Sequence, residues 1–318
     1  MSKPKIAFLF PGQGAQYVGM GKDFYDQFPS SRSIFERADH FLERPFSKVI
    51  FEGPSEELTQ TKNSQLAIYI VSLAIHAALV AKFPFVEPVI CAGLSLGEYT
   101  ALAAAGKISF EEGLSLVSKR SMFMQKACEA NPSSMRVALG LEGDVVEDAL
   151  SKLNLPVWVA NLNCPGQVVI AGSSEALDKA SEVLKPLGAK RVLPLEVSGA
   201  FHTPFMQSAQ DLLTPYLEKA DLQKSRVALV MNTPGNFVED LSSIRLNLIK
   251  QVTHPVRWQK GIESILQRGV DCFIEMGPGK TLQGMNKRIG VMDPIVSIEK
   301  VSELEEILKL QELFGGTA

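Results

Sequence analysis

The sequence has few cysteines, and they are far apart. Only four occur among the 318 residues, and no two of them form a C-x-x-C pair. They are Cys91, Cys128, Cys164 and Cys272. This pattern does not suggest a disulfide framework or a cysteine metal site. We therefore expect reduced, mostly buried thiols, a cytoplasmic protein and no bound metal.

Blocks of like charge and long apolar runs are also missing. The formal net charge is −3, with acidic and basic residues interspersed, so nothing indicates a nucleic-acid partner. The longest apolar-rich stretch, residues 66–80, contains polar side chains and is below spanning length. We expect a buried helix there rather than a membrane span. With no repeat, linker or low-complexity tract, the length suits one large domain, or one large and one small.

A serine motif stands at residues 93–97, which spell Gly-Leu-Ser-Leu-Gly. An apolar run of strand character, residues 88–92, precedes it, and helix-forming residues 98–105 follow it. This context is typical of a nucleophile elbow, a sharp strand-to-helix turn that exposes a serine hydroxyl at the head of a helix. A glycine-rich turn with an incidental serine is the alternative.

Four strands of buried character end in loops rich in glycine, proline or amide residues. The strands are residues 6–10, 88–92, 227–231 and 272–276. In an open α/β sheet the ligand site lies beyond the carboxyl ends of the strands. The loop at 11–16 lacks both the G-K-[ST] ending and the G-x-G-x-x-G spacing, so it is not a phosphate loop. The four loops together therefore predict one site at this edge.

Residues 132–198 change character and follow the order β-α-β-β-α-β, which is that of a ferredoxin-like unit. The expected strands are residues 136–140, 157–162, 167–171 and 191–197, and the expected helices are 144–153 and 174–187. We predict a core built from residues 1–131 and 199–318, with 132–198 inserted as a small subdomain. The alternative is that these elements extend the main sheet.

Three helix starts are indicated by capping residues. Ser64 precedes the apolar helix and is a plausible cap, in a region of helices interrupted by prolines. Ser109 begins a capping box for a helix that runs to about Glu129, and Ser302 begins one for the last helix.

A serine nucleophile needs a base, and the chain has four histidines. His40 lies in a charged helix, His76 in the apolar helix, and His254 before a proline. His202 stands in a loop of small residues after a strand, where a base can reach an elbow, so placement favours it.

The residues alone leave two roles open. A triad would need a carboxylate, and Glu275 is the nearest candidate, although it lies in a strand and could be structural. A dyad oriented by a carbonyl remains the other option. Arg120 is either a solvated helix residue or a bidentate site for a substrate carboxylate.

Five segments in order carry a family resemblance. They are residues 10–16 (FPGQGAQ), 93–99 (GLSLGEY), 199–206 (GAFHTPFM), Gln251 with 255–258 (PVRW), and 275–280 (EMGPGK). From about residue 5 to 300 the chain resembles the malonyl-CoA:acyl carrier protein transacylases of bacterial-type fatty acid synthesis. The resemblance implies an α/β fold, an α/β-hydrolase-like core with a parallel sheet plus an inserted ferredoxin-like α+β subdomain.

The resemblance also implies residue roles. Ser95 would be the nucleophile and His202 its base, oriented by the main-chain carbonyl of Gln251. The backbone N–H groups of Gln13 and Leu96 would form the oxyanion hole.

Arg120 would pair the malonyl carboxylate. The substrates would be malonyl-CoA and the phosphopantetheine thiol of acyl carrier protein, with no cofactor, no metal and a monomeric enzyme. Two positions depart from the family pattern. Leu94 stands where histidine is usual, and Arg136 where a small residue is usual. A serine esterase or thioesterase with the same elbow, and a non-catalytic carrier-binding module, are the competing readings.

Overall fold

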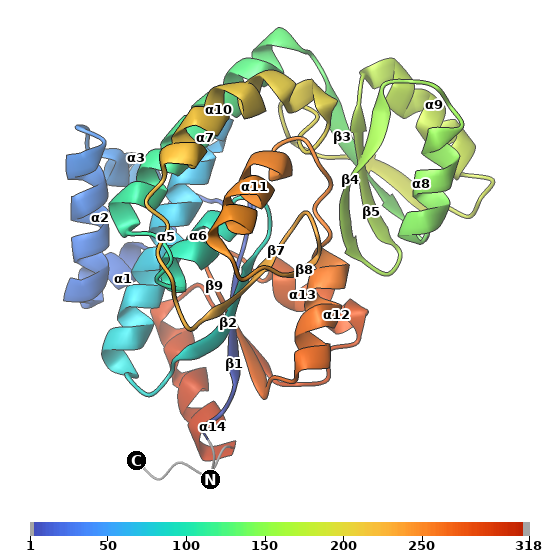
Figure 1. The fold of residues 1–318 in the computed structure, drawn as a ribbon. Helices are drawn as coiled ribbons and strands as arrows, with labels where there is room; N and C mark the ends of the chain where they lie inside the picture. Colours follow the sequence, from blue (N-terminus) through green and yellow to red (C-terminus); the bar gives the residue numbers. More distant parts are fainter. Residues whose placement is uncertain (1–2, 314–318) are drawn as a thin grey trace.

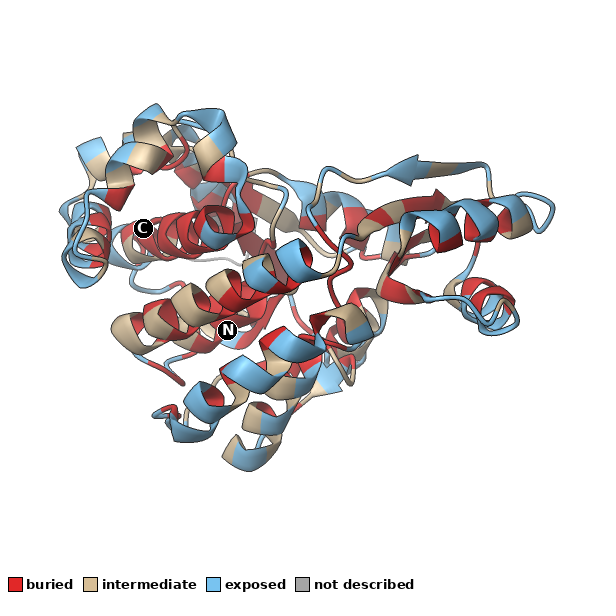
Figure 2. Ribbon diagram, turned by 90° about the horizontal axis from the view of Figure 1, so that it is seen from above, coloured by how far each residue is buried: buried red, intermediate tan, exposed pale blue. Residues whose placement is uncertain are grey.

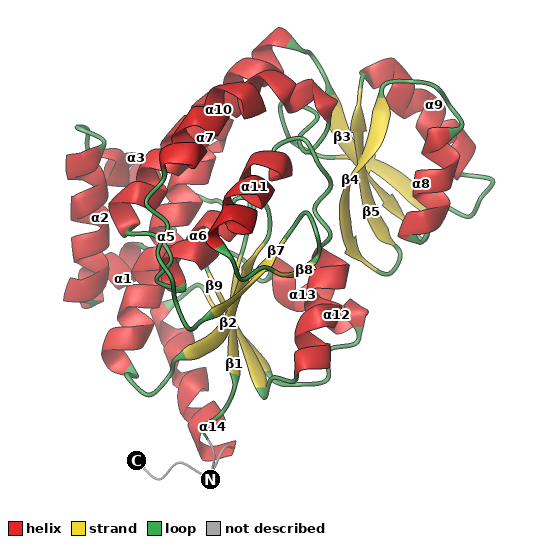
Figure 3. Cartoon of the chain, viewed as in Figure 1, coloured by secondary structure: helices red, strands yellow, loops and turns green. Residues whose placement is uncertain are grey.

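The computed structural model describes residues 3–313, which form two separate β-sheets with helices around them (Figures 1 and 3). The larger sheet has six strands in the order β10-β9-β1-β2-β7-β8, and every neighbouring pair is parallel except β7 and β8. The strands are β1 (Ile6–Phe10), β2 (Pro88–Gly93), β7 (Ala228–Met231), β8 (Asn236–Phe237), β9 (Cys272–Met276) and β10 (Ile295–Ile298). The predicted α/β class with a parallel sheet is confirmed.

Helices cover both faces of the larger sheet. All five residues of β1 are buried, as expected for a strand covered on both sides. Phe8 and Phe10 join the core made with α5, α6 and α7, whereas Ala7 and Leu9 join the core made with α12 and α13. Seen from above, buried residues concentrate where these helices meet the sheet (Figure 2). These helices are α5 (Thr61–Lys82), α6 (Gly97–Ala104), α7 (Phe110–Ala130), α12 (Trp258–Arg268) and α13 (Thr281–Ile289).

The remaining helices of the large lobe pack around this core. They are α1 (Lys22–Gln27), α2 (Pro29–Phe41), α3 (Phe46–Glu52), α4 (Ser55–Thr59), α10 (Gln207–Lys219), α11 (Leu241–Gln251) and α14 (Glu306–Leu313), with 3₁₀ turns at Pro204–Met206 and Val301–Glu305. By length and composition α5 could cross a membrane, but 78% of its apolar window is buried inside the protein. It is the central core helix that the sequence predicted.

The smaller sheet is antiparallel and has the order β4-β5-β3-β6. Helices α8 and α9 pack on it around a separate apolar core. This order is that of a ferredoxin-like unit, so the idea that these strands extend the main sheet is wrong. The exact subdomain boundaries, 131/132 and 198/199, remain a prediction. The elements are β3 (Ser134–Leu139), α8 (Gly143–Ser151), β4 (Val157–Cys164), β5 (Gln167–Gly172), α9 (Ser174–Leu184) and β6 (Arg191–Pro194).

Two of the three predicted caps are wrong. Ser109 does cap α7, accepting a hydrogen bond from the Glu112 N–H at 3.1 Å. Ser64 lies inside α5, which begins at Thr61. Ser302 lies inside the 3₁₀ turn Val301–Glu305 that precedes the last helix. The residue before this turn is Lys300, whose N–H donates to the Glu303 carboxylate, so Ser302 is not a cap.

Candidate active site

Ser95 stands at the turn between β2 and α6, with φ of 53°. The two glycines of the motif are required by close approach of the backbone. A Cβ on Gly93 would lie 1.9 Å from the Gly97 carbonyl oxygen, and one on Gly97 would lie 2.2 Å from that of Phe10. The predicted elbow is therefore present, and it holds the serine at the carboxyl edge of the parallel sheet.

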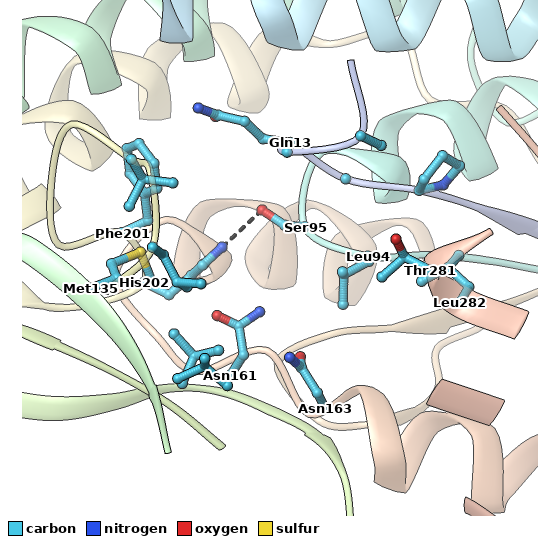
Figure 4. A pocket seen from close by; sticks show the side chains of 18 of the residues that line it. Gln13, Leu94, Ser95, Met135, Asn161, Asn163, Phe201, His202, Thr281 and Leu282 are labelled. Carbon is cyan, nitrogen blue, oxygen red and sulfur yellow. Dashed lines mark hydrogen bonds between the residues drawn. The ribbon is translucent and has the colours of Figure 1, made fainter. Parts of the chain in front are cut away.

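His202 approaches Ser95 from the connection that returns from the small sheet. Its Nε2 lies 2.8 Å from Ser95 Oγ (Figure 4). Its Nδ1 lies 2.7 Å from the main-chain oxygen of Gln251, at the end of α11. Because a carbonyl oxygen only accepts, Nδ1 carries the proton and Nε2 is left free to accept one from Ser95.

The surroundings keep His202 neutral. The side chain is 4% exposed, and burial followed by the charge of Arg120 lowers its pKa to about 3, while the bond to Gln251 opposes this shift. A neutral imidazole is the form that can take a proton from a hydroxyl.

Arg120 is buried in the site rather than solvated. It is 1% exposed on α7, and its Nη2 lies 3.1 Å from Ser95 Oγ and 2.9 Å from Gln251 Oε1. Its Nη1 donates to Gln65 Oε1 at 2.5 Å. A buried cation beside a reactive hydroxyl, with no carboxylate bonded to it directly among the described residues, is suited to a ligand that brings a negative charge.

Gln13 and Leu96 flank Ser95 on two elements. Leu96 directly follows the serine and is the N-cap of α6, and Gln13 lies in the loop after β1. Within residues 3–313 neither backbone N–H has a hydrogen-bond acceptor. Donors left free at a helix N-terminus are available to an anionic oxygen.

The site opens into a cavity of about 260 Å³ between the two lobes. Figure 4 shows Asn161 and Asn163 of β4 facing the Ser95 side across this space, with Phe201 and Met135 beside His202. Leu94, where the resemblance led us to expect histidine, also lines the cavity. Both lobes therefore contribute to one cleft.

The remaining candidates lie elsewhere. Glu275 is bonded to the first N–H groups of α13 and to Ser297, so it is structural and does not touch His202. His40 is exposed, His254 bonds to the Lys250 carbonyl, and His76 packs edge-on against Phe8.

Arg136 points away from the cavity. It bonds to Asp178 at 2.6 Å and to Ser181 at 2.9 Å, both on α9. Within the described residues, no group of three or more His, Cys, Asp or Glu could hold a metal ion.

Sequence reasoning missed three polar residues that hold this arrangement. Gln65 on α5 bonds to Arg120, and Asn232 after β7 accepts from the Ser95 N–H at 2.6 Å. Glu98 on α6 is fully buried and bonds to Asn232 and Gln251. The available signals were an amide in the loop after residue 231 and an acid within an otherwise apolar helix.

Comparison with known proteins gives one consistent result. Residues 7–304 match the family described as "Acyl transferase domain". A malonyl CoA-acyl carrier protein transacylase of Bacillus subtilis is 42% identical over 289 residues, 90% of each chain. The solved structure of such a transacylase from Clostridium perfringens has a TM-score of 0.92 and 39% identity, covering 98% of both chains. A malonyl-transacylase solved in complex with a type II PKS acyl-carrier protein also has a TM-score of 0.92, with 35% identity over 96% of this chain and 99% of the other.

Proposed function

The chain belongs to the malonyl CoA-acyl carrier protein transacylases, a family of acyltransferases, and on that premise we propose how its residues transfer a malonyl group. The acyl group passes from the coenzyme A thioester to Ser95 and then to the phosphopantetheine thiol of an acyl carrier protein. Exchanging one thioester for another through a serine ester divides the reaction into two similar steps. This gives ping-pong kinetics.

In the first step Ser95 Oγ attacks the thioester carbonyl while its proton moves to His202 Nε2. The N–H groups of Leu96 and Gln13 receive the negative charge that forms on the carbonyl oxygen. When this intermediate collapses, the carbon–sulfur bond breaks, and the departing coenzyme A sulfur takes the proton from His202. The second step runs the same path in reverse, with the carrier-protein thiol as nucleophile.

Arg120 supplies the selectivity for a carboxylated acyl group. Its guanidinium lies within 3.1 Å of Ser95 Oγ, so an acyl group on that oxygen places its own carboxylate within reach. A bidentate pair with a carboxylate is among the stronger polar contacts in proteins. An acetyl group leaves the buried cation without a counter-charge, which disfavours it.

One observation carries the proposal. His202 Nε2 and Arg120 Nη2 converge on the single oxygen of Ser95, at 2.8 and 3.1 Å. A simple esterase needs the first contact but has no use for the second. The proposal includes a monomeric enzyme in the cytoplasm that needs no metal or cofactor beyond its thioester substrates. All four cysteines are buried and free, which fits a reducing compartment.

Intact-mass measurement after mixing with malonyl-CoA tests the function. We expect one malonyl adduct on Ser95, stable until a carrier protein with its phosphopantetheine arm is added, and absent from Ser95→Ala. Parallel incubations with acetyl-CoA and methylmalonyl-CoA measure the selectivity. Rapid release of free malonate without a carrier protein would instead identify a thioesterase, and absence of any adduct would refute the transferase.

A further inference from the structure

Glu98 is a buried carboxylate directly beneath the nucleophile. It lies in the first turn of α6, three residues after Ser95, and is 0% exposed. Each of its oxygens accepts a hydrogen bond. Oε1 accepts from the Asn232 N–H at 2.6 Å, and Oε2 accepts from Gln251 Nε2 at 2.8 Å. Both carboxylate oxygens of Glu98 therefore act as hydrogen-bond acceptors.

The side chain of Gln251 is held in one orientation by its neighbours. Its two Nε2 hydrogens go to Glu98 Oε2 and to the Ser95 main-chain oxygen, the latter at 2.7 Å. Its Oε1 accepts from Arg120 Nη2 at 2.9 Å. Rotating this amide by half a turn would set Nε2 against the Arg120 donor and Oε1 against two acceptors.

Asn232 also holds the backbone of the elbow through two hydrogen bonds. Its Oδ1 accepts from the Ser95 N–H at 2.6 Å, and its Nδ2 donates to the Gly93 oxygen at 2.7 Å. Both backbone groups of the strained serine are therefore bonded to side chains, one from Asn232 and one from Gln251. Both of these residues are in turn bonded to Glu98.

We propose that Glu98 is a positioning residue that fixes the Gln251 amide and, through it, the place of Arg120. The amide lies between a buried anion and a buried cation, with its nitrogen toward Glu98 and its oxygen toward Arg120. Glu98 thus serves as the remote counter-charge of Arg120 without forming an ion pair with it. Arg120 remains free to pair with the carboxylate of a substrate. This inference rests on the proposed role of Arg120.

Burial and the hydrogen-bond partners act on Glu98 in opposite directions. Burial raises the pKa of Glu98 to about 8, whereas the bonds from Asn232 and Gln251 and the charge of Arg120 lower it. A protonated carboxyl would have to donate where only donors face it, so the geometry is that of the ionised form. Because every oxygen of this buried carboxylate has a hydrogen-bond donor, its partners fix its position.

Glu98→Gln is the direct test, because it keeps the shape and replaces one acceptor by a donor. We expect the preference for malonyl-CoA over acetyl-CoA, as a ratio of kcat/KM values, to fall about tenfold or more, since Arg120 loses the acceptor that places it. A loss confined to the fold would lower both rates equally. An unchanged ratio in Glu98→Gln overturns the proposal, even if the malonyl adduct on Ser95 still forms and the proposed function stands.

Glu275→Gln is the matched control. Glu275 is also 0% exposed and also accepts several hydrogen bonds, but they come from α13 and Ser297. We expect a lower unfolding temperature and an unchanged acyl preference. A fall in preference equal to that of Glu98→Gln would show that loss of any buried carboxylate has this effect, which overturns the assignment.

A second variant covers the case in which Glu98→Gln does not fold. Combining it with Gln251→Glu conserves the charge and restores a donor facing an acceptor between the two positions. We expect the double variant to recover folded protein, measured as a thermal transition. No recovery in the double variant would refute the donor–acceptor order on which the proposal depends.

Discussion

Ser95 and His202 both have positive φ angles, 53° and 61°, although neither is glycine. Such conformations cost about 1–3 kcal/mol each and persist where the surroundings determine them fully. Ser95 is held by bonds to both of its backbone groups, and His202 by its bond to Gln251 and the adjoining turn at Thr203. These bonds keep the hydroxyl of Ser95 and the imidazole of His202 facing each other at 2.8 Å.

We expect the proposed base, His202, to set the pH dependence of the reaction. Because burial and Arg120 lower its pKa to about 3, the free enzyme keeps a neutral base at every pH above about 4. We expect kcat/KM to show no acid limb from this group between about pH 5 and 7. Arg120→Ala should raise the pKa of His202 and bring an acid limb toward that range. It should also reduce malonyl transfer at least tenfold.

Profiles of kcat/KM against pH, taken with acetyl-CoA so that the carboxylate contact is not needed, measure this shift. Arg136→Ala is the control, because that guanidinium bonds to α9 and points away from the cavity. An acid limb near pH 6.5 in the unaltered enzyme would contradict a depressed pKa.

At the level of single residues, the sequence was sufficient for the elbow and the placing of His202. It could not decide whether Arg120 is solvated. Arg120 is buried because its guanidinium bonds to Gln65 on α5 and to Gln251 on α11, which lies 131 residues later in the chain. The residues around position 120 therefore could not indicate this contact.

Among the elements, α7 is the one that carries Arg120, and its start depends on a single cap. Ser109→Ala removes the acceptor for the Glu112 N–H and should lower the free energy of unfolding by about 1 kcal/mol. Arg120 lies three turns further along, so malonyl transfer should remain within about twofold of its original rate. Urea unfolding and steady-state kinetics measure the two effects.

Ser173→Ala removes the equivalent cap of α9, where Ser173 accepts from the Ala176 N–H. We expect a similar loss of stability there. A much larger kinetic effect of Ser109→Ala would show that the first turn of α7 contributes to placing Arg120.

Two elements near the C-terminus were not revealed by sequence patterns. The four-residue strand β10 and the helix α13 were not predicted. The first turn of α13 is bonded to Glu275, a residue of the neighbouring strand β9, so no local capping residue marks its start. The error at Ser64 has a related cause, since α5 begins a full turn earlier without any side-chain cap.

Across the whole molecule, the chain passes between the lobes at two adjacent places. Ser133 on the outgoing segment accepts from the Ala200 N–H on the returning one at 2.9 Å. Gly199, next to it, packs on α7 so closely that a Cβ would lie 2.3 Å from Cys128 Sγ. His202 follows three residues later, so its position depends on this crossing.

Gly199→Ala should therefore displace the His202 loop and reduce kcat by roughly 10²-fold. Adding Cys128→Ala removes the closest clash and should restore part of that loss. Steady-state kinetics of the single and double variants measure the coupling between the two sites. Full activity of Gly199→Ala alone would mean that the crossing has room to adjust.

The position of β1 between β2 and β9 also determines when the larger sheet can be completed during synthesis. Ile6 pairs with Cys272, so the first strand made must wait for one of the last. At ribosomal rates of about 5–20 residues per second, that wait is on the order of 10–50 s. Until then β1 has an open edge on the side that β9 will occupy. A nascent chain therefore completes the sheet that carries the elbow only when nearly all of it has been made.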